Sequence, residues 1–179
     1  MQLKKSTIKE DIMRLEFLTE EIKVEVKFLR NITNITLLKS DLNFVKKNCI
    51  RKVSLWMAIL LKNLGIVSIL KPEWFNTMWL KKKILDEQEK EELQFIPYNY
   101  VELTYILYKK AIEIFDFPVE MINLVEILFQ IRLSKIWKGI KKLKKNIEII
   151  KLNKICSVEL YSVKNIILLF FQLINDFKL

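Results

Sequence analysis

The sequence predicts a mainly helical protein that begins with a small β-rich module, and three observations lead to this fold class. Over residues 22–28 apolar and polar side chains alternate strictly, which is typical of a half-buried strand. From Val53 onward the apolar residues instead recur every three or four positions, as on one face of a helix. The 179 residues, 51% of them apolar, suffice for one ordinary domain or for two small ones that share a core.

The predicted N-terminal module covers residues 1–50. Its clearest element is the strand at 22–28. Residues 31–34 are turn-like, and residues 35–38 are a candidate for a further strand. A module of this size is too small to be stable alone, so we expect it to depend on the rest of the chain.

The predicted helical domain covers residues 51–179 and begins with a short helix. The apolar face of this helix includes Trp56, and the helix ends near Gly65. Pro72 and Glu73 are typical of a helix start, because proline suits the first turn and an acidic residue suits the positive end. That second helix would run into the acidic residues at 86–92, which we expect to project into solvent before Pro97 ends the helix.

Three further helices are expected. Apolar residues at helical spacing predict about four turns over residues 101–112. Pro118 begins a helix that keeps the same spacing to about residue 145. Ser157 is a candidate N-cap of the last helix. The expected architecture is therefore the β-rich module followed by a bundle of about five helices.

The composition excludes several classes of enzyme and ligand site. Without histidine there is no Ser-His-Asp or Cys-His arrangement and no histidine ligand for a metal. Gly65 and Gly139 are too far apart to build a phosphate-binding loop. Cys49 and Cys156 have no zinc-site spacing, and two free thiols fit a reducing, intracellular compartment. We therefore expect no catalytic residues, no metal site and no cofactor.

Neither the apolar runs nor the first residues predict a membrane span or secretion. The longest apolar runs, residues 53–61 and 165–175, are shorter than the roughly 18 to 20 residues that span a bilayer. The first residues lack the apolar segment of a secretory signal. Attachment to a membrane surface through an amphipathic helix is a weaker alternative.

The net charge of +10 is concentrated near the end of the longest predicted helix. Residues 135–156 contain eight lysines and one acidic residue, Glu148. One interpretation is a patch that contacts phosphates of nucleic acid without reading the sequence, and the other is a solvated helix end in a lysine-rich chain. Arginine, which grips phosphate with two donors at once, is scarce here. The candidate contacts are Lys138, Lys141, Lys142, Lys144 and Lys145.

Several helices are apolar on more than one face. In the last helix, residues 166–171 form an unbroken apolar run that includes Phe170 and Phe171. A surface helix of a monomer shows one apolar stripe, so this run indicates either a central core helix or a helix that faces another subunit, and we favour the subunit interface. Trp56 and Trp74 are candidates for the same interface, with core packing as the alternative.

The segment at residues 53–74 has a more specific pattern. It contains Leu-Trp-Met-Ala followed, after a gap, by Pro-Glu-Trp. Phe-Ile-Pro at 95–97 and Tyr-Val-Glu-Leu at 100–103 come next in order, and Arg132 and Lys135 follow. This order resembles the GINS subunit family called the second partner of Sld-five (Psf-two), over about residues 12 to 178. Residues 16–20 are similar to the opening strand of that family.

The chain departs from the family pattern at three places. Ser54 stands where the family has proline before Leu-Trp, and Lys71 stands where the first of two prolines is usual. Residues 39–48 replace a connection that is rich in glycine and proline in the family. The path of this connection is therefore not predicted.

The resemblance implies a fold and a function. It implies a small β-rich B domain followed by a five-helix A domain, in a nuclear, non-catalytic scaffold subunit of the heterotetrameric GINS complex. In this family the complex joins the MCM ring and a cell-division-cycle protein to form the replicative DNA helicase. Arg132 and Lys135 match basic positions of the family, where they would form an intersubunit salt bridge or a solvated face. The alternative function is a basic helical protein that binds nucleic acid through residues 135–154.

Overall fold

The computed structural model describes residues 14–33, 44–142 and 153–176, and in the last segment it describes side chains up to Leu169. The described chain is mostly helical and includes a small antiparallel sheet, which confirms the predicted fold class at this level. It divides into two compact units. We call Met1–Phe75 with Ile106–Asp116 the sheet unit, and Asn76–Tyr105 with Phe117–Leu179 the helical unit.

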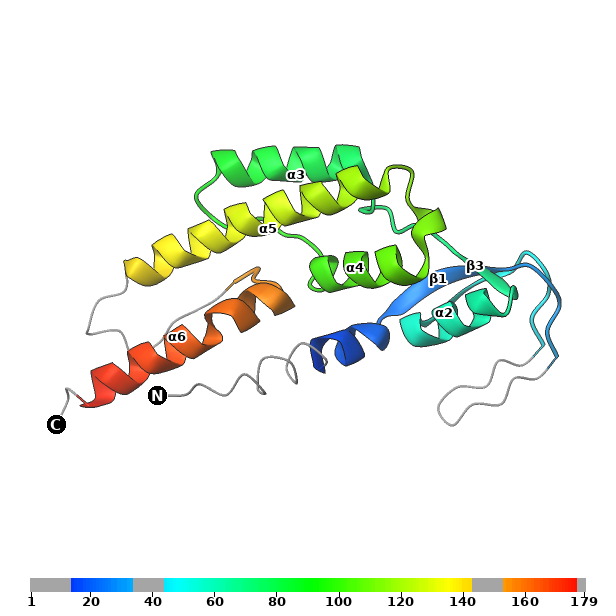
Figure 1. Cartoon of the computed structure of the whole chain (residues 1–179), viewed down its shortest axis with the longest axis horizontal. Coiled ribbons are helices and arrows are strands. Elements are labelled where there is room, and N and C mark those ends of the chain that lie inside the picture. Colours follow the sequence, from blue (N-terminus) through cyan, green and yellow to red (C-terminus); the bar gives the residue numbers. More distant parts are fainter. Residues whose placement is uncertain (1–13, 34–43, 143–152, 177–179) are drawn as a thin grey trace. The chain divides into compact units, whose positions relative to one another are not determined.

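The sheet has three strands in the order β2-β1-β3, and both pairs are antiparallel. Strand β1 (Lys23–Phe28) is central, because β2 (Ile50–Ser54) pairs with one edge and β3 (Val67–Ile69) with the other (Figure 1). Every second side chain of β1 is buried, which confirms the strand that the alternating pattern predicts.

Besides β1, strands were expected in the N-terminal module at residues 16–20 and 35–38. Residues 14–20 form a helix, so the strand expected at 16–20 is wrong. The hydroxyl of Thr19 donates to the carbonyl of Leu15 one turn earlier at 2.8 Å, a bond that only helical backbone brings into reach. The strand expected at 35–38 lies outside the described residues, and the third strand of the sheet is β3, which has only three residues.

Helix α2 (Leu55–Asn63) ends where the sequence predicts. Its last turn closes with a Schellman motif: the amide of Gly65 donates to the carbonyl of Lys62 at 2.8 Å, and the amide of Ile66 donates to that of Leu61 at 2.9 Å. Gly65 has a φ of +65°, in the left-handed region that favours glycine.

Replacing Gly65 with alanine is expected to lower the free energy of unfolding by about 1–2 kcal/mol, because an L-residue is strained at this φ. The added Cβ would also lie 3.4 Å from the Arg30 guanidinium, which donates to the carbonyls of Leu64 and Gly65. Urea unfolding of the full chain measures the change. Gly139→Ala is the matched control: its Cβ would meet nothing within 4 Å, so we expect stabilisation of about 0.5–1 kcal/mol. Equal changes in the free energy of unfolding at Gly65 and Gly139 would contradict the role assigned to Gly65 in ending α2.

The helical unit contains α3 (Thr77–Glu89), the first part of α4 (Tyr100–Lys110), α5 (Pro118–Lys141) and α6 (Ser157–Asp176). Helices α3 and α5 run side by side, and α6 contacts α5 (Figure 1). The apolar core between α3 and α5 is fully or almost fully buried, and it includes Leu80, Ile84, Leu124, Val125 and Leu128. This core holds in place the polar groups described below.

The start predicted for the second helix is wrong. Pro72 and Glu73 precede α3, which begins at Thr77. The carbonyl of Pro72 accepts from the amide of Phe75 at 2.9 Å in a separate turn. The cap is Asn76, whose side-chain oxygen accepts from the amide of Met78 at 2.9 Å. Pro118, in contrast, occupies the first turn of α5 as expected.

The predicted boundary between residues 50 and 51 falls at the first residue of β2. The sheet continues past it through β3, and the sheet unit also includes α2 and the short 3₁₀ helix Ile112–Ile114. The predicted domain boundary was placed where strand periodicity changes to helical periodicity. A strand further along the chain can still pair with a free edge of the sheet, so this change does not mark the end of the sheet. The division into a B domain and an A domain stays a prediction.

Candidate functional site

A cluster of charged side chains lies inside the helical unit. Arg132 of α5 pairs with Glu87 of α3 and with Glu159 of α6, and all three side chains are completely buried. Lys135, one turn along α5, pairs with the second oxygen of Glu87 at 2.7 Å. We call these four residues the charge cluster. It contains two cations and two carboxylates, so its formal charges balance.

The guanidinium of Arg132 has five N–H donors, and each can be matched to an oxygen. Nε donates to Glu159 Oε1 at 2.6 Å, and Nη2 donates to Glu159 Oε2 at 3.0 Å. Nη2 also donates to the carbonyl of Lys154 at 2.6 Å. Nη1 donates to Glu87 Oε1 and, at 2.9 Å, to the carbonyl of Gln94. One side chain therefore joins α3, α5, α6 and the two segments that lead into α4 and α6.

The two carboxylates have further partners. Glu159 accepts from the amide of Cys156 at 2.9 Å and from the hydroxyl of Tyr100 at 3.2 Å. Glu87 accepts from the amide of Gln94 at 2.8 Å. The contact between Glu159 and the amide three residues earlier is one half of a capping box, so the carboxylate also caps α6.

The cap predicted at Ser157 is therefore wrong. Ser157 is the first residue of α6, and Cys156 stands at the N-cap position. The Ser157 hydroxyl instead contacts the carbonyl of Tyr98 at 3.1 Å and the side chain of Glu102. Serine can take this place because its hydroxyl both donates and accepts.

Burial and the charge cluster shift the pKa values of neighbouring groups. Burial by itself would lower the pKa of Arg132, but the hydrogen bonds and charge of Glu159 raise it above the ordinary value. Burial and the nearby Glu159 raise the pKa of the Cys156 thiol to about 12, and they also raise the pKa of Tyr100. The thiol therefore stays protonated near neutral pH, which is the unreactive form.

The sequence interpretation missed both carboxylates. Glu87 belongs to the acidic run at 86–92 that was expected to lie in solvent, and this expectation is wrong for Glu87. The burial of Glu87 could have been predicted from its position, since Leu80, Ile84 and Glu87 follow helical spacing on the buried face of α3. Glu159 held no comparable signal apart from its place in the first turn of α6.

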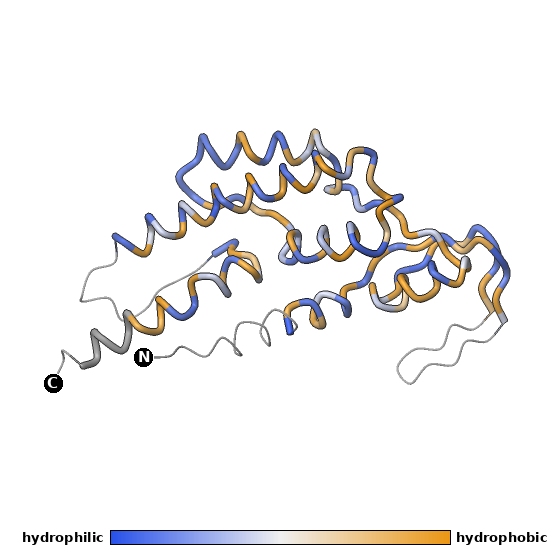
Figure 2. The backbone as a smooth tube through the Cα atoms, viewed as in Figure 1, coloured by the Kyte–Doolittle hydropathy of each residue, from blue (hydrophilic) through white to orange (hydrophobic). Residues whose placement is uncertain are grey.

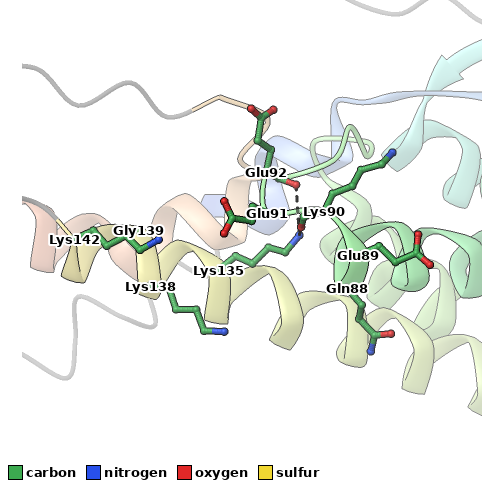
Figure 3. Close-up of a pocket in the computed structure, with 9 residues that line it drawn as sticks. All are labelled: Gln88, Glu89, Lys90, Glu91, Glu92, Lys135, Lys138, Gly139 and Lys142. Atoms are coloured by element: carbon green, nitrogen blue, oxygen red, sulfur yellow. Dashed lines mark hydrogen bonds between the residues drawn. The ribbon is translucent and has the colours of Figure 1, made fainter.

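Lys135 and its neighbours line a groove of about 430 Å³ between the end of α3 and the end of α5 (Figure 3). Lys135 reaches across the groove to the main-chain oxygens of Lys90 and Glu92. Three carboxylates stand among the lysines. The lining residues are Gln88, Glu89, Lys90, Glu91, Glu92, Lys135, Lys138, Gly139 and Lys142.

The structure divides the predicted lysine patch. Lys135 is paired within the chain, and Lys154 lies 4.0 Å from Glu92. The exposed members of the described part are Lys138, Lys141, Lys142 and Lys154. Lys144 and Lys145, the other two candidates for nucleic-acid contact, lie outside the described residues. The acidic side chains that face this region reduce its positive potential.

The candidate interface residues lie in different environments. Arg132 is in the core and paired within its own chain. Trp74 is half-buried and meets the ring of Phe75 edge-on at 5.3 Å. Trp56 is 36% exposed on α2, where Leu60 and Leu64 continue the same helical face. Phe170 and Phe171 belong to α6, but their side chains lie outside the described part.

Exposed apolar side chains follow the last buried residue in the described part of α6. Val163 is its last buried residue among those described. Beyond it Ile166, Leu168 and Leu169 are 40%, 50% and 46% exposed. Figure 2 shows hydrophobic residues along the described part of this helix. The arrangement can hold helices together and present an apolar helix to a partner.

Among the described residues, no group of three or more Cys, Asp or Glu residues could hold a metal ion. No described helix is long and apolar enough to cross a membrane.

No family model matches the chain. Several curated relatives named "DNA replication complex GINS protein PSF2" do match it. The chain is 31% identical to the protein of Candida albicans over 153 residues, which cover 84% of this chain and 74% of the relative. It is 30% identical to the protein of Xenopus laevis over 129 residues, or 70% of this chain and 69% of the relative. Against Debaryomyces hansenii the identity is 32% over 132 residues, 66% of this chain, and the chain spans 64% of that protein.

Proposed function

Since the chain belongs to the PSF2 family of DNA replication complex GINS proteins, we propose that it is a non-catalytic scaffold subunit of a nuclear GINS heterotetramer. The role is to hold three sister subunits together and to help dock the complex on the MCM ring and a cell-division-cycle protein. In this assignment the complex acts in the initiation and elongation of chromosomal replication, as part of the replicative helicase.

The exposed apolar residues at 166–169 of α6 are the observation that carries this proposal. Side chains on several sides of the helix, Ile166, Leu168 and Leu169, are apolar and about half exposed. A helix that is apolar all round is stable when other protein surrounds it. Helical apolar surface of this kind marks a contact with another subunit more often than a free surface.

The face of α2 formed by Trp56, Leu60 and Leu64 is a second candidate contact. The three residues are spaced four apart and exposed, while Met57, Ala58 and Leu61 on the other side are buried. An exposed tryptophan beside two leucines supplies the large apolar area that interface centres use.

Co-expression tests the proposed function. We expect the chain to be poorly soluble alone and to be recovered in a soluble complex when the three sister subunits are expressed with it, because the exposed apolar surface is then covered. Affinity capture through a tag on this chain, followed by quantification of each sister subunit, measures it. A stable, soluble monomer that captures none of them would contradict the proposal.

Nucleic-acid binding through the lysines is the alternative, and it leads to a separate prediction. Changing Lys138, Lys141 and Lys142 to glutamate is expected to leave the assembly intact, because these side chains are exposed and outside the charge cluster. The salt dependence of DNA affinity of the purified complex measures phosphate contact. The control carries the same charge change on α3, at Lys81, Lys82 and Lys83. Loss of DNA affinity and of replication function in the Lys138, Lys141 and Lys142 variant, but not in the α3 control, would favour nucleic-acid binding.

A further inference from the structure

We propose that Glu102 is held as the uncharged acid and that it donates a hydrogen bond which links the first turn of α4 to the first turn of α6. The proposal makes the attachment of α6 sensitive to pH. It concerns the folded helical unit alone, so it does not depend on the identity of any partner.

The contact between the two turns is buried and polar. Glu102 lies in the first turn of α4 and Ser157 is the first residue of α6. Both are buried, and the Glu102 Oε1 atom contacts the Ser157 hydroxyl. The second carboxyl oxygen, Oε2, is buried without a hydrogen-bond partner in the described structure.

The hydrogen bonds around Ser157 can accommodate the acid as a donor. The Ser157 hydroxyl can donate its one hydrogen to the carbonyl of Tyr98, which lies 3.1 Å away and can only accept. Its oxygen can then accept twice, from the Asn99 amide at 3.4 Å and from a protonated Glu102. In this assignment the hydroxyl uses all of its bonding capacity. The unpartnered Oε2 is then the carbonyl oxygen of a neutral acid, which costs less to bury than half of a negative charge.

The surrounding charges favour the same state. The cations of the charge cluster, Arg132 and Lys135, are already balanced by Glu87 and Glu159. Ionised Glu102 would add a third carboxylate, and the charge of Glu159 from α6 opposes it.

The shift of the Glu102 pKa agrees with this assignment. Burial raises the pKa and is the largest cause, and Glu159 adds to it. The Ser157 hydroxyl and the amides of Glu102 and Val158 act in the opposite direction without reversing the shift. Two other titratable groups lie near this contact, Tyr100 at the start of α4 and Cys156 before α6. Both have raised pKa values and supply no positive charge.

The consequence for stability follows from linkage. Between the ordinary Glu value of 4.5 and the raised pKa, the folded chain holds a proton that the unfolded chain has released. The contribution of Glu102 to stability is therefore complete below 4.5 and declines as the pH rises through that window.

Glu102→Gln tests the proposal, because the glutamine amide can donate to Ser157 at every pH. Relative to wild type, the variant is expected to lose this decline and to gain stability as the pH rises. Urea unfolding of the full chain at a series of pH values measures it. The matched control, Glu120→Gln, removes an exposed carboxylate that pairs with Lys81, and its pH curve should keep the wild-type decline.

A direct measurement guards against a variant that folds poorly. The infrared difference spectrum of wild type minus Glu102→Gln, recorded at a series of pH values above 4.5, should show the carbonyl band of one protonated carboxylic acid at pH values where an ordinary glutamate is mostly ionised. A carboxylate band in its place would overturn the proposal. So would identical pH dependence of unfolding in the two proteins.

Discussion

Replacing Arg132 with methionine is expected to lower the free energy of unfolding by about 3–5 kcal/mol, because it leaves the buried carboxylate of Glu159 without a cation and leaves Glu87 with Lys135 alone. Methionine fills most of the volume, so the loss comes from charge and hydrogen bonds more than from packing. Five hydrogen bonds from the guanidinium to oxygen atoms are lost, including those to the main-chain oxygens of Gln94 and Lys154. Urea unfolding of the full chain, with limited proteolysis where yields are low, measures the change.

Arg132→Lys separates charge from geometry. Lysine keeps the positive charge but has three donors that rotate together, in place of five in a fixed plane. We therefore expect a stability between those of the methionine variant and wild type. The control is Lys81→Met, which breaks an exposed pair with Glu120 and should change stability by less than about 1 kcal/mol. If Arg132→Met were no more harmful than this control, the charge cluster as described would be wrong.

Changing Leu168 and Leu169 together to lysine is expected to reduce capture of the proposed sister subunits at least tenfold. Both side chains are about half exposed in the chain itself, so the fold should tolerate the change. At a subunit interface, however, two unpaired charges would lose their water, and this costs far more than at a surface. Quantified capture of each sister subunit by the tagged chain measures the effect.

Leu85→Lys is the control for this variant. Leu85 on α3 is 57% exposed, similar to Leu168, and the residues that share its helix face include Lys81, Lys82 and Glu89. An added lysine in these polar surroundings should leave capture unchanged. Equal capture by the wild type and by the α6 variant would exclude the second half of α6 from the interface.

Local chemistry explains the elements that the sequence predicts well. The strand β1 follows from its period of two, the start of α5 from Pro118, and the end of α2 from Gly65. Each of these signals acts within a few residues. The apolar run at residues 166–171 likewise lies in a single helix, α6, as expected.

The missed features depend on distant residues or on very short elements. The burial of Glu87 is decided by Arg132, which is 45 positions away in the chain. No local pattern distinguishes this glutamate from the exposed ones beside it, apart from its place on the apolar face of α3. Strand β3 has three residues, too few for an alternation to be recognised.

The charge cluster and the exposed apolar surface have different tasks in this account. The cluster fixes α3, α5 and the first turn of α6 to one another. The exposed residues Ile166, Leu168 and Leu169 of α6 can then contact another protein. Variants of the cluster should therefore change the stability of the chain, and variants at Leu168 and Leu169 should change its assembly.

The native mass of the purified assembly tests the central claim most directly. The chain is co-expressed with its three proposed sister subunits and captured through its own tag. The mass of the captured complex is then measured under conditions that keep it intact. We predict a mass equal to one copy of each of four subunits. A mass equal to this chain alone, or to copies of this chain without the sister subunits, would contradict the account.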